Sequence, residues 1–259
     1  MFDTHAHLGD PALLPQLAAI VDRAGAAGVT KINTVGYDLP SSLLALDIAA
    51  QYAGTVYATV GVHPAEADKI GVDDLAQLFK LARQPQVVAW GEIGLDYHYD
   101  DGPERAVQQQ LFRAQIALAR ESGLPIVIHD RDAHQDVLAI LKEEGATENG
   151  GVMHCFSGSW ETAKAAMSLG MMISFAGPLT FTNARQPVEV AAKVPLDMLL
   201  IETDCPYLSP HPFRGKTNEP ARVVHTAAKL AEIKGLEYRR IEEITTENAR
   251  RLFRLGEDD

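Results

Sequence analysis

The feature of this 259-residue sequence that most constrains its fold is the alternation of short apolar runs with longer amphipathic segments. The apolar runs are rich in β-branched residues, as is typical of buried strands in a parallel sheet. They span residues 1–8, 31–37, 56–63, 87–93, 125–129, 151–156, 171–176 and 199–203. The segments between them have apolar residues at helical spacing, and several end at a glycine such as Gly28 or Gly123. The pattern predicts an α/β protein whose helices connect parallel strands.

Eight such units favour closure into a (β/α)₈ barrel, the TIM barrel, over an open doubly wound sheet. An open sheet of the nucleotide-binding type would more often carry a glycine-rich turn after its first strand, and this sequence has none there. We find no linker rich in Pro, Gly or Ser. Because barrels of this kind commonly reach this length, we expect one domain over residues 1–259.

The formal net charge of -12 at pH 7 argues against a broad basic face that coats nucleic acid. A polyanionic substrate would have to be held locally, by metal ions and a few basic side chains. No apolar run reaches bilayer-spanning length, and the first residues lack the basic and apolar blocks of a signal peptide. We therefore expect a cytoplasmic protein without membrane association, and we infer no obligate protein partner.

Polar side chains that can bind metal follow most of the predicted strands. In (β/α)₈ barrels the C-terminal ends of the strands form the rim that carries catalytic groups. A single histidine after a strand is more often a hydrogen-bonded structural residue, but many ligand types on one rim favour a metal site. The residues concerned are His5, His7, His63, Glu92, His129, His154 and Asp204.

This mixture of residue types suits two divalent cations. Neutral imidazoles bind a cation without adding charge, and a carboxylate can bridge two cations about 3.5 to 4 Å apart, as in two-metal hydrolysis. The predicted ligands are His5, His7 and Asp204 for one cation, His129 and His154 for the other, and Glu92 as the bridge. Glu92 and Asp204 are also the predicted catalytic carboxylates, with Asp204 placed to orient the attacking water or accept its proton. The ligand types leave Mg²⁺, Mn²⁺ and Zn²⁺ as candidates, and four histidine ligands are soft for magnesium, which favours zinc or another transition metal in the isolated protein.

Other residues near the rim are candidates for substrate binding. His63 precedes a proline that holds it at the rim, and we assign it a catalytic role through substrate contact; the alternative is a structural histidine bonded to a carboxylate. Arg131 either pairs with an acidic neighbour or binds a phosphate. In the loop after the last strand, Phe213 is a candidate for stacking on a base, and Arg214 and Lys216 are candidates for phosphate contact. The alternative, given equal weight, is that this loop is a solvated lid without substrate contacts.

Six ordered motifs resemble those of the TatD family of metal-dependent hydrolases. They are DTHAH at 3–7, GVHP at 61–64, GEIGLDY at 91–97, PIVIHDR at 125–131, HCFSG at 154–158 and ETDCP at 202–206. The resemblance implies a barrel of the amidohydrolase type, two divalent cations and magnesium-dependent deoxyribonuclease activity, often 3′ to 5′ exonucleolytic on single strands and sometimes on RNA. Carried over to matching positions, it implies as ligands His5, His7, Glu92, His129, His154 and Asp204.

The principal hypothesis is therefore a metal-dependent phosphodiesterase with nucleic acid, first of all single-stranded DNA, as substrate. In a second hypothesis the same metal site hydrolyses an ester or amide bond in place of a phosphodiester. The protein would then be a D-aminoacyl-tRNA deacylase, which one branch of the family resembles, or another ester or amide hydrolase. A third is a noncatalytic scaffold that uses the ions for stability. A rim open to solvent argues against the third, because structural metal sites are usually closed.

Overall fold

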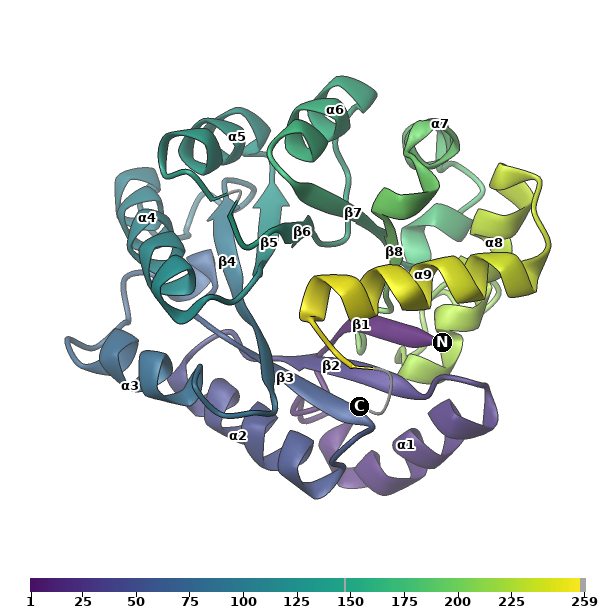
Figure 1. The fold of residues 1–259 in the computed structure, drawn as a ribbon, viewed down its shortest axis with the longest axis horizontal. Coiled ribbons are helices and arrows are strands. Elements are labelled where there is room, and N and C mark those ends of the chain that lie inside the picture. Colours follow the sequence, from purple (N-terminus) through teal and green to yellow (C-terminus); the bar gives the residue numbers. More distant parts are fainter. Residues whose placement is uncertain (147, 257–259) are drawn as a thin grey trace.

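The computed structural model describes residues 1–146 and 148–256, and its eight parallel strands follow one another around a barrel (Figure 1). They are β1 (Phe2–Ala6), β2 (Lys31–Val35), β3 (Val56–Val60), β4 (Val87–Asp96), β5 (Ile126–Arg131), β6 (Gly151–Met153), β7 (Met171–Phe175) and β8 (Leu199–Ile201). Each strand pairs in parallel with the next along the chain. The (β/α)₈ prediction is confirmed.

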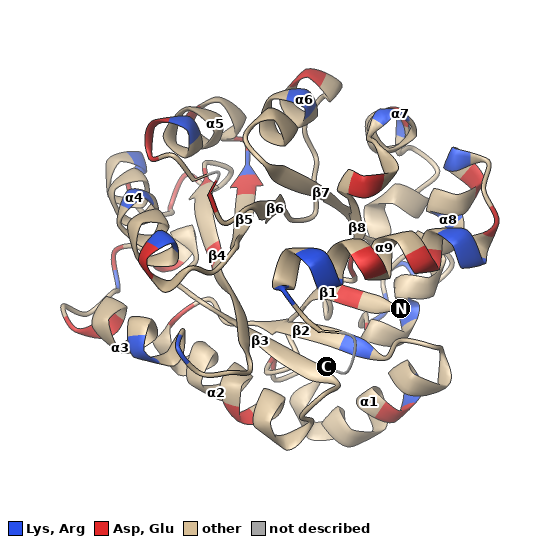
Figure 2. Cartoon of the chain, viewed as in Figure 1, with Lys and Arg blue, Asp and Glu red and all other residues tan. Residues whose placement is uncertain are grey.

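The helices surround the strands as an outer ring (Figure 1). They are α1 (Leu17–Ala26), α2 (Leu39–Gln51), α3 (Asp74–Leu81), α4 (Arg105–Ser122), α5 (His134–Glu143), α6 (Trp160–Ser168), α7 (Arg185–Lys193), α8 (Val223–Lys234) and α9 (Tyr238–Phe253). Acidic and basic residues are interspersed over these helices in Figure 2. In the described part of the chain, no helix combines the length and apolarity needed to cross a bilayer.

The barrel closes between β1 and the chain that follows β8. Ala6 and Cys205 form a parallel bridge, and the His7 amide donates a hydrogen bond to the Cys205 carbonyl oxygen at 2.8 Å. The Asp3 carboxyl accepts hydrogen bonds from the amide and the hydroxyl of Thr203, at 2.8 and 2.6 Å. Burial raises the pKa of Asp3 to about 8, because it disfavours the charged form. The first and last motifs of the sequence are thereby held side by side.

One end of the barrel is filled with apolar side chains and covered by α9 (Figure 1). Ala249, Leu252 and Phe253 of α9 belong to one buried cluster with residues of the strands. The strand residues of this cluster are Phe2, Tyr57, Val88, Ala89, Val127, Val152, Met172 and Leu200. The rings of Phe2 and Phe253 lie 5.5 Å apart between centroids. This end serves the stability of the fold.

Strand periodicity carries polar residues to the opposite end. Val127 on β5 belongs to the cluster beneath α9, and His129 lies two residues further along the same strand. Val152 on β6 and His154 have the same spacing. Since side chains two residues apart in extended chain point to the same side, Val127 and Val152 near α9 each have a histidine above them at the C-terminal end.

The strand bounds differ from the prediction: β4 and β5 extend beyond their predicted ends, and the other strands are shorter than predicted. Strand β4 continues three residues beyond the predicted end and keeps pairing with β5, because Gly94 allows the two backbones to approach closely. A Cβ atom on Gly94, whose φ is +143°, would lie 2.0 Å from the carbonyl oxygen of His129. The chain after β6 and after β8 leaves the extended conformation at Cys155 (φ 42°) and Asp204 (φ 56°), so these strands end early.

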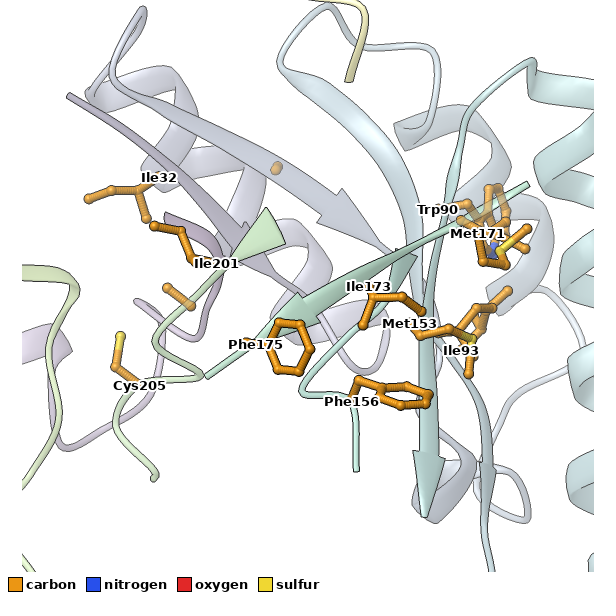
Figure 3. Packing of buried hydrophobic residues seen from close by; sticks show 14 of the residues in the cluster. Ile32, Trp90, Ile93, Met153, Phe156, Met171, Ile173, Phe175, Ile201 and Cys205 are labelled. Carbon is orange, nitrogen blue, oxygen red and sulfur yellow. The ribbon is translucent and has the colours of Figure 1, made fainter. Parts of the chain in front are cut away.

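The larger apolar core extends from the strands to the surrounding helices. Trp90 of β4 and Phe112 of α4 are among its largest fully buried side chains. The Trp90 indole donates a hydrogen bond to the side-chain oxygen of Gln115 at 3.2 Å, which satisfies its one polar group. Figure 3 shows Phe175 of this core at the end of β7 and Phe156 in the chain that follows β6.

Candidate metal centre

A pocket of about 550 Å³ opens at the C-terminal ends of the strands. Five of the predicted ligands line it, namely His7, Glu92, His129, His154 and Asp204. The sixth, His5, is fully buried beneath them. The structure thus brings together all six side chains from strands that are far apart in the sequence.

Glu92 lies at the centre of the group. Its Oε2 atom lies 3.3 Å from His5 Nε2 and 3.8 Å from His7 Nε2. Its Oε1 atom lies 2.7 Å from His129 Nδ1 and 2.9 Å from His154 Nε2. Each oxygen of the carboxylate therefore faces a different pair of imidazoles.

Asp204 faces the same pair of histidines as Glu92 Oε2. Its Oδ1 atom lies 3.8 Å from His5 Nε2 and 3.5 Å from His7 Nε2, and the two Nε2 atoms lie 3.3 Å apart. Donor atoms close enough to share an ion occur, among the described residues, in the groups His5–Glu92–His154, His5–His7–Asp204 and His63–Asp96–His129.

In His7 and His154, the hydrogen bond made by Nδ1 determines which ring nitrogen carries the proton and which carries the lone pair. His7 Nδ1 lies 3.1 Å from the carbonyl oxygen of Val35, and His154 Nδ1 lies 3.1 Å from Glu202 Oε1. Glu202 Oε1 also accepts a hydrogen bond from the Cys155 amide at 2.7 Å. Since these oxygens accept, both Nδ1 atoms donate, and in the neutral rings both Nε2 atoms present a lone pair to the centre.

The His129 ring is turned the other way, with Nδ1 towards the centre, but it also presents a lone pair there. Its Nε2 lies 3.0 Å from Asp96 Oδ2, while its Nδ1 faces Glu92. Asp96 is held in turn by the amide of His98, which donates to its Oδ1 atom at 3.0 Å. With Nε2 donating to this carboxylate, the lone pair of the neutral ring lies on Nδ1. The donor set therefore fits metal ions, which bind neutral imidazole and ionised carboxylate.

His63 differs from the other histidines of the site. Its Nδ1 atom accepts a hydrogen bond from the amide of Ala65 at 3.1 Å, so its neutral ring carries the proton on Nε2. That nitrogen lies 3.8 Å from Glu92 Oε1, and the ring lies edge-on to that of His129. Burial and the nearby His129 lower the pKa of His63 to about 3, so the ring is neutral at neutral pH. His63 thus offers an N–H donor to the pocket.

The two central carboxylates are ionised in spite of their burial. Burial disfavours the charge of Glu92, but the attraction of His154 and His5 and the hydrogen bonds that His129 and His154 donate when their rings are protonated hold its pKa well below the usual range. Burial likewise opposes the charge of Asp204, and a hydrogen bond from a protonated His7 with the attraction of His154 lowers its pKa. Both carboxylates are therefore in the ionised form that binds a cation, and the ring protons are lost when a cation binds.

Asp96 and Glu202 are site residues that the sequence analysis missed. Both lie inside motifs that were identified, Asp96 four residues after Glu92 and Glu202 two residues before Asp204. For Glu202 the available signal was its place in the predicted strand 199–203, two residues before Asp204. No local signal was available for Asp96, because the predicted strand ended at Ile93. Tyr37 and Tyr207, whose rings lie 6.2 and 6.0 Å from that of His7, also line the pocket.

The predicted substrate-binding residues divide into two sets. His63 and Arg131 line the pocket, and Arg131 donates a hydrogen bond to the hydroxyl of Tyr99 at 3.2 Å. The loop residues Phe213, Arg214 and Lys216 are not among those that line it. Phe213 packs instead against His225 and beneath the Arg222 guanidinium, Arg214 lies over the ring of Phe181, and Lys216 lies 6.0 Å from the Phe213 ring.

We expect the substitution Asp96→Asn to lower metal affinity by about 10- to 100-fold, the cost typical of losing a carboxylate that orients a ligand histidine. The asparagine amide would donate to His129 Nε2 and move the ring proton to Nδ1, where it opposes metal binding. Calorimetric titration with Mn²⁺ measures the effect. The matched control is Asp132→Asn, whose carboxylate binds the exposed His98. Equal affinities in the wild type and Asp96→Asn would contradict this role.

Comparison with known proteins adds independent evidence. A family model described as TatD related DNase matches residues 2–254. The chain is 49% identical to an uncharacterized metal-dependent hydrolase, YabD, of Bacillus subtilis, over 99% of this chain and 100% of that protein. It is 34% identical to the 3′-5′ ssDNA/RNA exonuclease TatD of Edwardsiella piscicida, over 99% and 100% of the two chains.

Solved structures agree with this result. The crystal structure of the TatD homologue YJJV from Escherichia coli superposes with a TM-score of 0.93 at 33% identity, covering 99% of this chain and 98% of that one. An uncharacterized amidohydrolase from Saccharomyces cerevisiae has the same fold, with a TM-score of 0.86 at 18% identity over 97% and 99% of the two chains. These structures confirm the predicted (β/α)₈ barrel fold.

Proposed function

Since this chain belongs to the TatD family of metal-dependent hydrolases, we propose that it is a nuclease that removes nucleotides from the 3′ end of single-stranded DNA or RNA. The observation that carries the proposal is the position of Glu92 between two pairs of imidazoles, with one oxygen directed at each pair. Exonucleases of this specificity among the relatives support the choice of substrate.

In this proposal two divalent cations are held by His5, His7, Glu92, His129, His154 and Asp204. When bound, the cations polarise the phosphoryl oxygen, lower the pKa of the attacking water and neutralise charge on the leaving oxygen. Mg²⁺ is proposed for activity, and Mn²⁺ or Zn²⁺ also suit the histidine-rich ligand set.

The protein's own groups position the substrate and move the proton. Asp204, ionised and open to the pocket, orients the water and accepts its proton as the water oxygen attacks phosphorus. The bond from phosphorus to the 3′ oxygen of the preceding nucleotide breaks, and a 5′-mononucleotide is released. His63 donates its Nε2 proton in a hydrogen bond to a phosphate oxygen, and Arg131 adds a positive charge at the rim.

The test is hydrolysis of a 5′-labelled single-stranded DNA oligonucleotide by the purified protein with Mg²⁺, Mn²⁺ or Zn²⁺. We expect a ladder of products that shortens from the 3′ end, abolished by a chelator and restored by metal. A duplex, an RNA strand and a D-aminoacyl-tRNA are assayed in parallel. Turnover of the charged tRNA without degradation of either oligonucleotide would replace this proposal with the deacylase hypothesis.

A further inference from the structure

The pocket has two walls of different chemistry. The metal-binding side chains form one wall. The other, the apolar wall, comes from the end of β7 and from the chain after β6, β7 and β8, and its apolar residues are Phe156, Phe175, Ala176, Pro178, Leu179 and Leu208. The segment that follows β7 contributes no ionisable side chain to the pocket. The structure therefore places a surface suited to an apolar group beside the candidate metal centre.

Leu208 is the exposed edge of this apolar wall. Its side chain is 39% exposed, whereas Phe156 and Leu179 behind the pocket surface are 7% and 1% exposed. The backbone of Leu208 is in the left-handed region, with φ 53°, which is unfavourable for a residue of this type. The absence of a side chain at Gly177 makes room for this backbone, because a Cβ atom on Gly177 would lie 1.9 Å from the Leu208 carbonyl oxygen.

Backbone strain is concentrated around this pocket. Among the described residues, five non-glycine residues have positive φ, and three of them, Cys155, Asp204 and Leu208, line the pocket. Such conformations cost free energy and persist where the surrounding structure enforces them, most often at binding and catalytic sites. An exposed leucine held in this way beside a metal site indicates that the apolar wall is a built binding surface.

We infer that this apolar wall binds the base of the terminal nucleotide, an inference that rests on the proposed nuclease function. In a nucleotide a flat ring with apolar faces lies next to a phosphodiester. In the pocket an apolar wall lies next to the candidate metal centre, so the base and the phosphate could each meet a matching surface. Tyr207 and Leu208 both line the pocket and are 54% and 39% exposed, so this edge of the pocket meets solvent. Because the wall offers mainly apolar contact, it should accept every base, as stacking surfaces do.

The test compares a single-stranded oligonucleotide with a normal 3′-terminal thymidine and the same strand with an abasic 3′ terminus. We expect the wild type to cleave the normal end with a kcat/KM about tenfold higher, the order of effect that base contacts provide. In Leu208→Asn this preference should fall to near unity, since asparagine tolerates the left-handed backbone but removes the apolar surface. Leu43→Asn, the same change on an exposed leucine of α2, should keep it.

Direct binding separates this inference from the nuclease proposal. By calorimetry with Mn²⁺ present, the wild type should bind thymidine 5′-monophosphate about tenfold more tightly than deoxyribose 5-phosphate, and Leu208→Asn should lose this difference. Equal affinities of the wild type for the two ligands would overturn the base site, even if DNA were hydrolysed. Preserved discrimination without hydrolysis of any oligonucleotide would reject the nuclease function and retain the base site.

Discussion

Replacing Glu92 by glutamine should lower kcat/KM on single-stranded DNA by at least about 10²- to 10³-fold, the cost of removing one preorganised electrostatic group. Glutamine keeps the shape of the side chain but exchanges one oxygen for an NH₂ group, which cannot bind a cation. One of the two imidazole pairs then loses its shared carboxylate oxygen. Metal affinity should fall with activity, because the remaining groups are mostly neutral rings.

Initial rates of oligonucleotide cleavage and a Mn²⁺ titration of the same preparation measure this effect. The matched control is Glu161→Gln on α6, an exposed carboxylate away from the pocket, which should behave as the wild type. Circular dichroism checks that the barrel is retained. A Glu92→Gln protein that binds metal and cleaves DNA at the wild-type rate would remove the observation on which the proposed function depends.

The substitution Gly94→Ala should reduce the free energy of unfolding by about 2 to 6 kcal/mol, from ~1–3 kcal/mol of backbone strain and ~1–3 kcal/mol of overpacking. The new methyl group would meet the His129 carbonyl oxygen at 2.0 Å, in a backbone conformation that side chains rarely adopt. Either β4 separates from β5 or the strand rearranges. Both outcomes displace Glu92 relative to His129.

Urea unfolding followed by circular dichroism measures this change. Gly25→Ala in α1 is the contrasting control, because no atom lies within 4 Å of its Cβ position and alanine favours a helix. We expect it to raise stability by up to about 1 kcal/mol. If Gly94→Ala had the same midpoint of urea unfolding as the wild type, the fold would not require the close approach of β4 and β5 at this position.

The barrel and the six candidate ligands could be predicted because the signals are local. Each strand is a short apolar run, and each ligand stands at or just after the end of one. Asp96 could not be placed in this way, since the sequence predicted that β4 ends at Ile93 and only the pairing around Gly94 extends it. Its contact with His129 depends on the register between two strands.

The role of the loop after β8 depends on tertiary packing that composition does not reveal. Phe213, Arg214 and Lys216 have side chains suited to nucleic acid, yet Phe213 packs against His225 of α8 and Arg214 lies over Phe181. The apolar wall of the pocket was overlooked for the opposite reason. Residues such as Leu179 and Leu208 are indistinguishable in sequence from ordinary core leucines, and only their position around the pocket suggests binding.

The apolar plug beneath α9 leaves a substrate no passage through the barrel. Under the proposed function, the incoming strand and the departing mononucleotide must both pass through the open end of the pocket at the C-terminal ends of the strands. Cleaved nucleotide must then leave before the shortened strand can advance. Accumulated mononucleotide should therefore inhibit further cleavage, because it occupies the position in the pocket that the next 3′ end needs.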